Sequence, residues 1–260
     1  MFDFASLDGQ LGGYVRLELL PNQDTCWYWA WVVGPDRPPV VVLDQEVPLP
    51  RGAGLELRTT GLWADHIVEE PFEHVSVGAE AFALLLDDPA EALGPLVGMP
   101  TPFGLDLGWE TAGARTSTAG TTEGYGLPCH VVGEVLVADE RIELDGIGHR
   151  WHTWGVEDWW SAGWRSVAGR LDDGTWFADR TEVGANDRAL EPHDATFPTS
   201  DRARLEEQGL DLVIEPLAFA PVPVANDDGR ACRLVRALCR YRDPSSEHCG
   251  VGWTEWNQPL

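Results

Sequence analysis

Residues 148–160, GHRWHTWGVEDWW, bring together side chains whose types could do chemistry. The segment holds four tryptophans, two histidines, one arginine and two acids: Trp151, Trp154, Trp159, Trp160, His149, His152, Arg150, Glu157 and Asp158. An indole face is electron-rich and stabilises a nearby cation by about 0.5–2 kcal/mol. A carboxyl group in an apolar wall has a raised pKa, which suits a proton donor. We therefore expect an aromatic pocket that favours a carbocation, with Glu157, Asp158 or Glu255 as neighbouring acids.

These side chains need strands to position them. Successive side chains on a strand point to opposite faces, so Arg150, His152 and Trp154 should share one face. His149 and Trp151 should share the other face. Because the two histidines lie on opposite faces, they cannot chelate one ion together. No cluster of His, Cys or carboxylate has ligand spacing, so no metal site and no cofactor are predicted.

The same alternation places large rings beside small or polar residues in later runs. Beyond a bend expected at Gly155, Trp160 shares a face with Ala162 and Trp164, and Trp253 shares one with Glu255 and Asn257. A barrel that holds a ligand needs broad apolar walls with a few inward polar groups. The predicted substrate-binding residues are Trp63, His149, Trp151, Trp154, Trp160, Trp164 and Trp253.

Each of these residues also has a simpler structural explanation. Any single tryptophan can be core packing, since indoles suit buried strands. Each histidine can be a buried residue with satisfied hydrogen bonds, and Glu157 and Asp158 can pair with Arg150 or Arg165. The run DHIVEEPFEH (65–74) reads as a solvated sheet edge, although His66 and His74 could reach a cavity mouth.

The rest of the chain predicts an all-β fold. Short apolar runs alternate with Gly, Pro and Asp turns, and turns at 138–140 and 172–174 indicate hairpins. Only 87–98 and 200–211 are expected as short helices, the second capped by Ser200 and ended by Gly209. The Gly-rich polar segment 111–127 reads as a linker. It divides the chain into two β domains, 1–115 and 126–260.

Charge and composition exclude several classes of partner. The net charge of −25 disfavours nucleic acid and anionic membrane surfaces. All basic residues are arginine, which excludes Schiff-base and P-loop lysine chemistry. No apolar run is long enough to insert in a membrane and the first residues do not form a signal peptide, so a cytoplasmic location is expected. The five widely spaced cysteines should be reduced and mostly buried.

Three segments resemble one known family. They are GIGHRWHTWGVEDWW (146–160), GVGWTEWNQP (250–259) and EVPLPRGAGLELRTTGLWAD (46–65). The chain resembles the lipocalin-like proteins that include hydroxyneurosporene synthase, a carotenoid hydratase, and the AttH-type proteins. Natural-product cyclases and Diels–Alderases share that architecture. The resemblance implies two lipocalin-like β-barrels or half-barrels packed together, with a pocket for a terpenoid or polyketide-like substrate.

The central motif carries the specific part of the resemblance. The family signature is Gly-x-Gly-x-x-Asp-His-x-Trp-Gly, and Gly148, His152, Trp154 and Gly155 match it. Trp151 stands where the family has an aspartate, the proton donor to an alkene in its hydratases. The resemblance therefore implies an acid from elsewhere. We expect Asp158 or Glu255 in this role, with His152 as a helper.

Three functions follow from these observations. The first is a cofactor-independent cyclase or isomerase that folds a hydrophobic polyene by shape, cation stabilisation and proton donation. The second is an isoprenoid hydratase or dehydratase, and the third is a non-catalytic carrier of a lipophilic small molecule. All three predict a hydrophobic small-molecule partner. They leave the substrate and the oligomeric state open.

Overall fold

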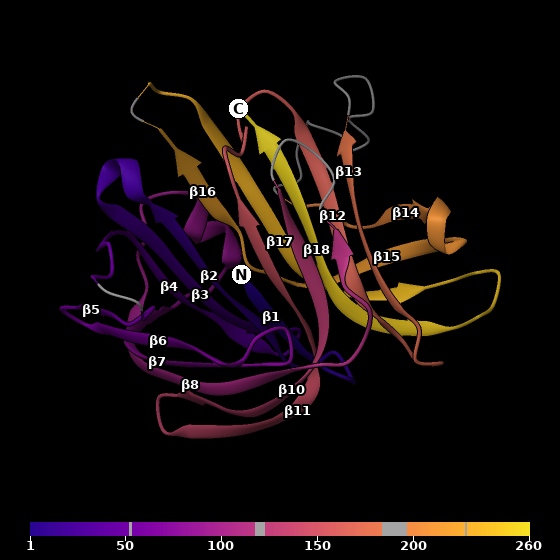
Figure 1. The fold of residues 1–260 in the computed structure, drawn as a ribbon, viewed down its shortest axis with the longest axis horizontal. Coiled ribbons are helices and arrows are strands. Elements are labelled where there is room, and N and C mark those ends of the chain that lie inside the picture. Colours follow the sequence, from indigo (N-terminus) through magenta and orange to yellow (C-terminus); the bar gives the residue numbers. More distant parts are fainter. Residues whose placement is uncertain (52–53, 118–122, 184–196, 227) are drawn as a thin grey trace.

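The computed structural model describes residues 1–51, 54–117, 123–183, 197–226 and 228–260, and these residues form two β-sheets (Figure 1). The first sheet contains β1 (Phe2–Ser6), β2 (Gly12–Leu20), β3 (Thr25–Gly34), β4 (Arg37–Pro48), β5 (Leu57–Thr59), β6 (Leu62–Glu70), β7 (His74–Leu85), β8 (Met99–Thr111), β9 (Thr116–Ser117), β10 (Glu123–Val137) and β11 (Glu140–Trp154). The second contains β12 (Gly163–Leu171), β13 (Trp176–Val183), β14 (Asp201–Leu205), β15 (Leu210–Phe219), β16 (Val222–Ala225), β17 (Ala231–Arg242) and β18 (Cys249–Pro259).

The first sheet closes into a barrel. Its strands follow the order β4-β3-β2-β1-β11-β10-β8-β7, and β7 pairs again with β4 through Val40–Leu85 and Val41–Leu84. All these pairings are antiparallel, so eight strands form a closed ring, with β6 and β5 extending it beyond β7. Alternate side chains fill the interior, including Phe4, Val15, Tyr28 and Trp109.

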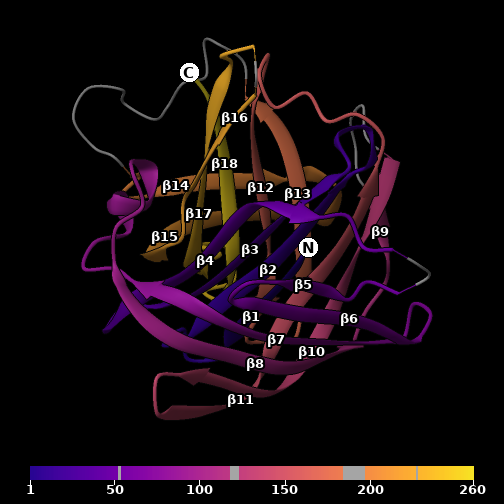
Figure 2. The same cartoon turned by 90° about the vertical axis from the view of Figure 1, so that its left-hand side faces the viewer.

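The second sheet is a nearly closed barrel that packs against the outside of the first (Figure 2). Its order is β13-β12-β18-β17-β15-β14, with β16 pairing with β17. A cluster rich in tryptophan fills the space between the barrels, where Trp29 and Trp31 of β3 join Trp253 of β18. The predicted all-β architecture of two packed lipocalin-like barrels is confirmed.

The chain passes from the first sheet to the second at 155–162, between β11 and β12. The predicted linker, 111–127, lies instead within the first sheet. It contains the end of β8, all of β9 and the start of β10, while 118–122 lie outside the described residues. Residues 123–154 therefore belong to the first barrel by strand pairing. Whether the halves 1–115 and 126–260 fold as separate domains stays a prediction.

The expected helices are much shorter than predicted. The first is reduced to a 3-10 helix, Pro89–Leu93, with Asp88 as its N-cap. The second prediction is wrong for 201–205, which form β14: Ala203 and Leu205 are buried while Arg202 and Arg204, which alternate with them, are exposed. Only a 3-10 turn, Glu206–Gln208, follows, and Gly209 ends it with φ +67°. Buried and exposed residues alternate along this segment with a period of two, which fits a strand, although several of its residue types favour a helix. A third short turn covers Pro21–Gln23.

The two predicted hairpins and the cysteine prediction are confirmed. The β10–β11 hairpin turns at Ala138, which has φ +55°, and the β12–β13 hairpin turns at Gly174, with φ +93°. The five cysteines are free, and Cys249 alone among them is not fully buried.

Candidate active site

A cavity of about 1370 Å³ opens at one end of the first barrel and extends between the two barrels. Its wall comes from the ends of β2, β3, β4, β6, β7, β10 and β11, from the crossover at 155–160, and from residues 225–226 beside β16. Its aromatic lining residues are Phe2, Trp27, Phe72, Tyr125, Trp151, Trp154, Trp159 and Trp160. A cavity of this size with an aromatic wall suits a hydrophobic small molecule.

The strand register shows which side chains of β11 enter the barrel. Arg150 pairs with Leu127 and His152 pairs with Tyr125 across the β10–β11 ladder. Leu127 belongs to the core of the first barrel, so Arg150 and His152 point to the interior. Trp154 continues this row at the mouth. The predicted sharing of one face by these three residues is confirmed.

The opposite face of β11 points to the second barrel. His149 is buried, and its ring stacks on Trp151 and meets the edge of Trp176. Burial lowers the pKa of His149 to about 3, with a smaller contribution from Arg236. His149 is therefore neutral, and it does not line the cavity.

Tyr125 and His152 form a hydrogen-bonded pair on the wall of the cavity. The Tyr125 hydroxyl lies 3.3 Å from Nδ1 of His152, and Trp154 stands edge-on to both rings. Burial lowers the pKa of His152, so its imidazole is neutral at neutral pH. A neutral imidazole whose Nδ1–H donates to the tyrosine oxygen leaves Nε2 as a base.

His66 and Arg150 are the polar groups deeper in the barrel. His66, on β6, is 5% exposed and lines the cavity, and neither ring nitrogen has a partner in good hydrogen-bond geometry, although the backbone of Leu55 lies beside the ring. Burial lowers its pKa to about 4, so it is neutral. Arg150 is 6% exposed and donates one hydrogen bond, from Nη2 to the Thr111 hydroxyl at 3.3 Å. Both side chains adjoin Phe2.

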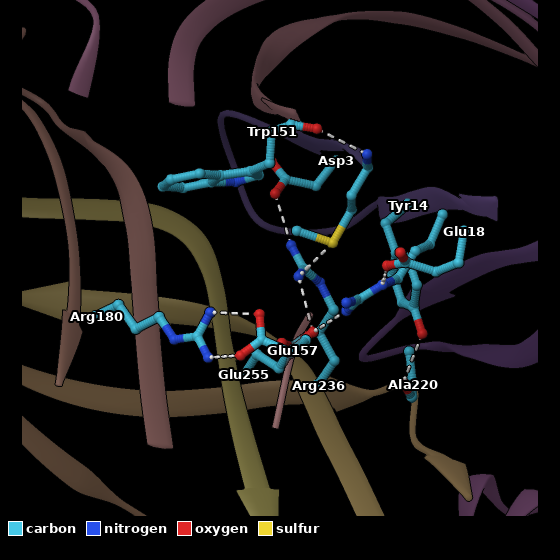
Figure 3. Close-up of polar contacts among 11 residues, drawn as sticks. Asp3, Tyr14, Glu18, Trp151, Glu157, Arg180, Ala220, Arg236 and Glu255 are labelled. Carbon is cyan, nitrogen blue, oxygen red and sulfur yellow. Dashed lines mark hydrogen bonds and ion pairs between the residues drawn. The ribbon is translucent and has the colours of Figure 1, made fainter. Parts of the chain in front are cut away.

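A buried ionic network joins the two barrels next to the cavity (Figure 3). Arg236 on β17 donates from Nη2 to Asp3 at 2.6 Å and from Nη1 to Glu255 at 3.2 Å. Glu255 also accepts from Arg16 at 3.3 Å, and Arg16 donates from Nε to Glu18 at 2.5 Å. Arg16 and Glu18 reach the cavity wall, while the other three residues lie behind it.

The charges of this network decide the state of its acids. Three carboxyl groups face two arginines, which leaves one negative charge in excess. Burial raises the pKa of Asp3 to about 6, and Arg236 offsets part of that shift. For Glu255, burial raises the pKa, but Arg16 and Arg236 together outweigh it and the pKa is lowered. Glu255 is therefore ionised, and Asp3 is the acid of the network that takes up a proton most readily.

The crossover at 155–162 covers the cavity and is fixed to the second barrel. Glu157 makes a two-point ion pair with Arg180, at 2.6 and 3.2 Å (Figure 3). Asn257 of β18 donates to the carbonyl oxygens of Trp159 and Ala162 at 3.0 and 3.2 Å. These contacts hold Trp159 and the adjacent ring of Trp160 against the cavity.

The three residues predicted as catalytic do not lie together. His152 lines the cavity, whereas Asp158 and Glu255 do not. Asp158 is exposed, and hydrogen bonds from Ser161 and the backbone of Trp160 lower its pKa. Both carboxylates are therefore ionised at neutral pH, which does not favour proton donation. Their catalytic roles stay predictions.

The predicted binding residues also divide into two groups. Trp151, Trp154 and Trp160 line the cavity. His149, Trp164 and Trp253 pack between the barrels instead, and Trp63 lies on a separate surface groove, where its Nε1 donates to Glu56. His149, Trp164 and Trp253 are buried behind the cavity and support it, whereas Trp63 lies apart from it.

Sequence reasoning did not single out Arg150 or Tyr125 as functional. For His66, the sequence favours a position on a solvated sheet edge, with a position at a cavity mouth as the alternative. The same alternative was open for His74, which is exposed and does not line the cavity. The period-two pattern Leu62, Ala64, His66 is the available signal, because it places the histidine on the same face as two buried apolar residues.

Among the described residues, no group of three or more His, Cys, Asp or Glu side chains is arranged to hold a metal ion. None of the helices in the same part of the chain is long and apolar enough to span a bilayer.

Two solved structures illustrate the similarity of this fold to known proteins. A Nitrosomonas europaea protein assigned as AttH has a TM-score of 0.56 and 12% identity, with 100% of this chain and 92% of that chain covered. Kievitone hydratase from Nectria haematococca has a TM-score of 0.57 and 10% identity, with 99% and 88% covered. At these identities the likeness extends to the fold alone. It agrees with the resemblance found in the sequence.

Sequence comparison places the chain in a family without an assigned activity. No curated protein matches the chain. One family model, described as a domain of unknown function (DUF7064), matches residues 1–195. That match covers the whole first barrel, the crossover and the start of the second barrel, so it includes most of the cavity wall. The chain belongs to the DUF7064 family.

Proposed function

We propose that this protein is an enzyme that adds water to a carbon–carbon double bond of a hydrophobic small molecule, or forms such a bond by removing water from an alcohol. The observation that carries the proposal is the Tyr125–His152 pair on the wall of the aromatic cavity. It offers a neutral base next to a hydroxyl group, in a site large enough for the substrate. The fold shared with a protein named as a hydratase supports this reaction class.

His152 can carry both proton transfers of the reaction. For hydration, Nε2 takes a proton from water while the water oxygen bonds to one alkene carbon and the π electrons move to the other carbon. The imidazolium then protonates that second carbon, which returns His152 to its neutral form. Tyr125 orients the ring by accepting from Nδ1. Dehydration follows the same steps in reverse.

Cyclisation of a polyene is the second candidate, because indoles from the first barrel and from the crossover face the cavity. A carbocation would need these ring faces free. Arg16 lies 4.9 Å from the ring centroid of Trp159 and 5.4 Å from that of Trp29, so a resident cation already occupies part of this aromatic surface. This contact favours the hydratase.

The test begins with the small molecules that co-purify with the full chain, identified by mass spectrometry. These molecules and a panel of hydrophobic alkenes and alcohols are then incubated with the protein in water labelled with oxygen-18. We expect labelled product with one water added, or loss of one water from an alcohol. His152→Ala should abolish this turnover, and His130→Ala, a change at an exposed histidine outside the cavity, should retain it.

Other outcomes would contradict the proposal. A cyclic product of unchanged mass would support the cyclase, and deuterium from heavy water in that product would show that a proton starts the reaction. Tight binding that quenches tryptophan fluorescence, without turnover of any compound, would support a carrier.

A further inference from the structure

Arg150 differs from the other two buried arginines next to the cavity. Arg16 and Arg236 each contact two carboxylates. Among the described residues, no carboxylate lies within ion-pair distance of Arg150, and its Nε is buried without a hydrogen-bond acceptor. A buried guanidinium without a counter-ion is costly. This site is therefore incomplete in a way that an anionic ligand would correct.

His66 adds a second unused polar group to the same region. Neither ring nitrogen has a partner in good hydrogen-bond geometry although the side chain is almost fully buried, and the backbone of Leu55 is the group beside the ring that raises its pKa. Its ring centroid lies 5.6 Å from that of Phe2, the residue that pairs with Arg150 across β1 and β11. A neutral imidazole can donate one hydrogen bond to an oxygen of a bound anion. Arg150 and His66 thus offer a charge and a donor at the inner end of the cavity.

Apolar side chains also line the cavity. They are Phe2, Leu17 and Val75, and the more exposed Val68 and Phe72. An elongated hydrocarbon would therefore contact the barrel wall while its polar end reaches the arginine. Two of the three cavity acids are paired elsewhere, Glu18 with Arg16 and Glu157 with Arg180, and the third, Glu46, makes no ion pair with Arg150 among the described residues.

We propose that the substrate is a hydrophobic carboxylic acid whose carboxylate binds Arg150 and His66 at the inner end of the cavity. One guanidinium and one neutral imidazole match the single negative charge of a carboxylate better than the charge of a phosphate monoester, about −1.5 to −2. His152 lies two residues along the same face of β11, roughly 7 Å away. The double bond that reacts would then lie close to the carboxyl end.

This inference rests on the proposed use of the cavity as the substrate site, but its test needs no turnover. The full chain is titrated with cis-parinaric acid, a fluorescent polyene acid, and with its methyl ester, near neutral pH. We expect the acid to bind about tenfold more tightly or better, since a charge-assisted hydrogen bond is lost in the ester. Equal affinities for acid and ester in the unmodified protein would overturn the inference, even if turnover is observed.

Variants then test whether Arg150 causes the preference for the acid over the ester. Arg150→Met should reduce acid binding to the level of the ester and leave ester binding unchanged, while Arg150→Lys should keep part of the preference. Arg115→Met is the matched control, because Arg115 lies near Phe72 and Tyr125 but is exposed. Loss of the preference in Arg115→Met, with retention in Arg150→Met, would refute the assignment.

The nature of the anion is tested with dodecanoate and dodecyl phosphate as competitors. Dodecanoate should displace the probe more effectively. Stronger displacement by the phosphate would contradict a carboxylate site. If Arg150→Met does not fold, the comparison of acid, ester and phosphate in the unmodified protein still decides the question.

Discussion

Individual buried side chains make the stability of this protein depend on pH. His149 and His66 are neutral in the fold, with pKa values lowered by burial to about 3 and about 4. In the unfolded chain both take up a proton near pH 6.5. The free energy of unfolding should therefore fall as the pH drops below about 6.5, by about 1.4 kcal/mol per pH unit for each histidine.

Asp3 acts in the opposite direction. Its pKa is raised to about 6 in the folded protein. Between about pH 4 and pH 6 the folded protein therefore holds a proton on Asp3, whereas the unfolded chain does not. The contribution of this proton to the free energy of unfolding is lost as the pH rises through 6. One carboxyl group thus offsets one of the two histidines, and a net loss on acidification remains.

Urea unfolding between about pH 5 and pH 7 measures this balance. His149→Gln should flatten the decrease in stability towards low pH, and Asp3→Asn should make it steeper. An acid dependence that is identical in the native chain and in both variants would show that neither group has a shifted pKa.

The residues of the candidate site were only partly predictable. Strand alternation correctly placed Arg150, His152 and Trp154 on one face, because that property is local. Whether Arg150 has a counter-ion depends on Asp3 and Glu255, whose carboxylates pair with Arg236 instead. Which arginine these carboxylates pair with depends on packing between distant segments, so the residues near position 150 cannot predict it.

At the scale of elements, two glycines explain the start of the central motif. Gly146 and Gly148 lie on β11 where β1 crosses most closely, and a Cβ at these positions would overlap the backbone oxygens of Ala5 and Asp3. The absent side chains let β1 approach, and β1 carries Asp3 to Arg236. The glycines of the motif therefore position the network behind the cavity.

Gly148→Ala should separate β1 from β11. We expect a loss of about 1–3 kcal/mol in the free energy of unfolding, because the added methyl group meets backbone and not a flexible side chain. Gly94→Ala is the control, since Gly94 is exposed and has open space around its Cα. Chemical denaturation measures both variants. Equal stability of the two would disprove the close-approach explanation.

The crossover between β11 and β12 was predicted only in part. The bend expected at Gly155 is present, with φ +109°, but the strand expected beyond it, with Trp160 and Ala162 on the face of Trp164, begins only at Gly163. Asn257→Leu should remove the two hydrogen bonds that hold this segment. The expected result is faster release of a bound polyene with a small change in stability, measured by stopped-flow fluorescence. Unchanged release would show that the crossover does not control access.

For the whole molecule, the sequence predicted two barrels but not how the chain is divided between them. The Gly-rich segment around residue 115 has the composition of a linker. It nevertheless connects strands of one barrel, because β11 pairs with β1 and so brings residue 150 to residue 2. Pairing over such a sequence separation depends on the closure of the barrel, which residue types do not specify.

The contact between the barrels gives the last prediction. Arg236 is 4% exposed, pairs with Asp3 and Glu255, and lies 4.9 Å from the ring centroid of Tyr14 and 5.2 Å from that of Trp253. Arg236→Met leaves Asp3 buried without its cation and leaves Glu255 with Arg16 alone. The expected loss is about 3–5 kcal/mol in the free energy of unfolding.

Two further variants separate charge from packing. Adding Asp3→Asn to Arg236→Met should recover part of the loss, because a buried charge is removed as well. Arg202→Met breaks a two-point ion pair with Asp211 that has similar distances but is exposed to water, so its midpoint in urea should not change measurably. Recovery shows that uncompensated charge causes the instability. If the double variant is as unstable as Arg236→Met, the arginine holds the barrels together by its contacts with the two rings.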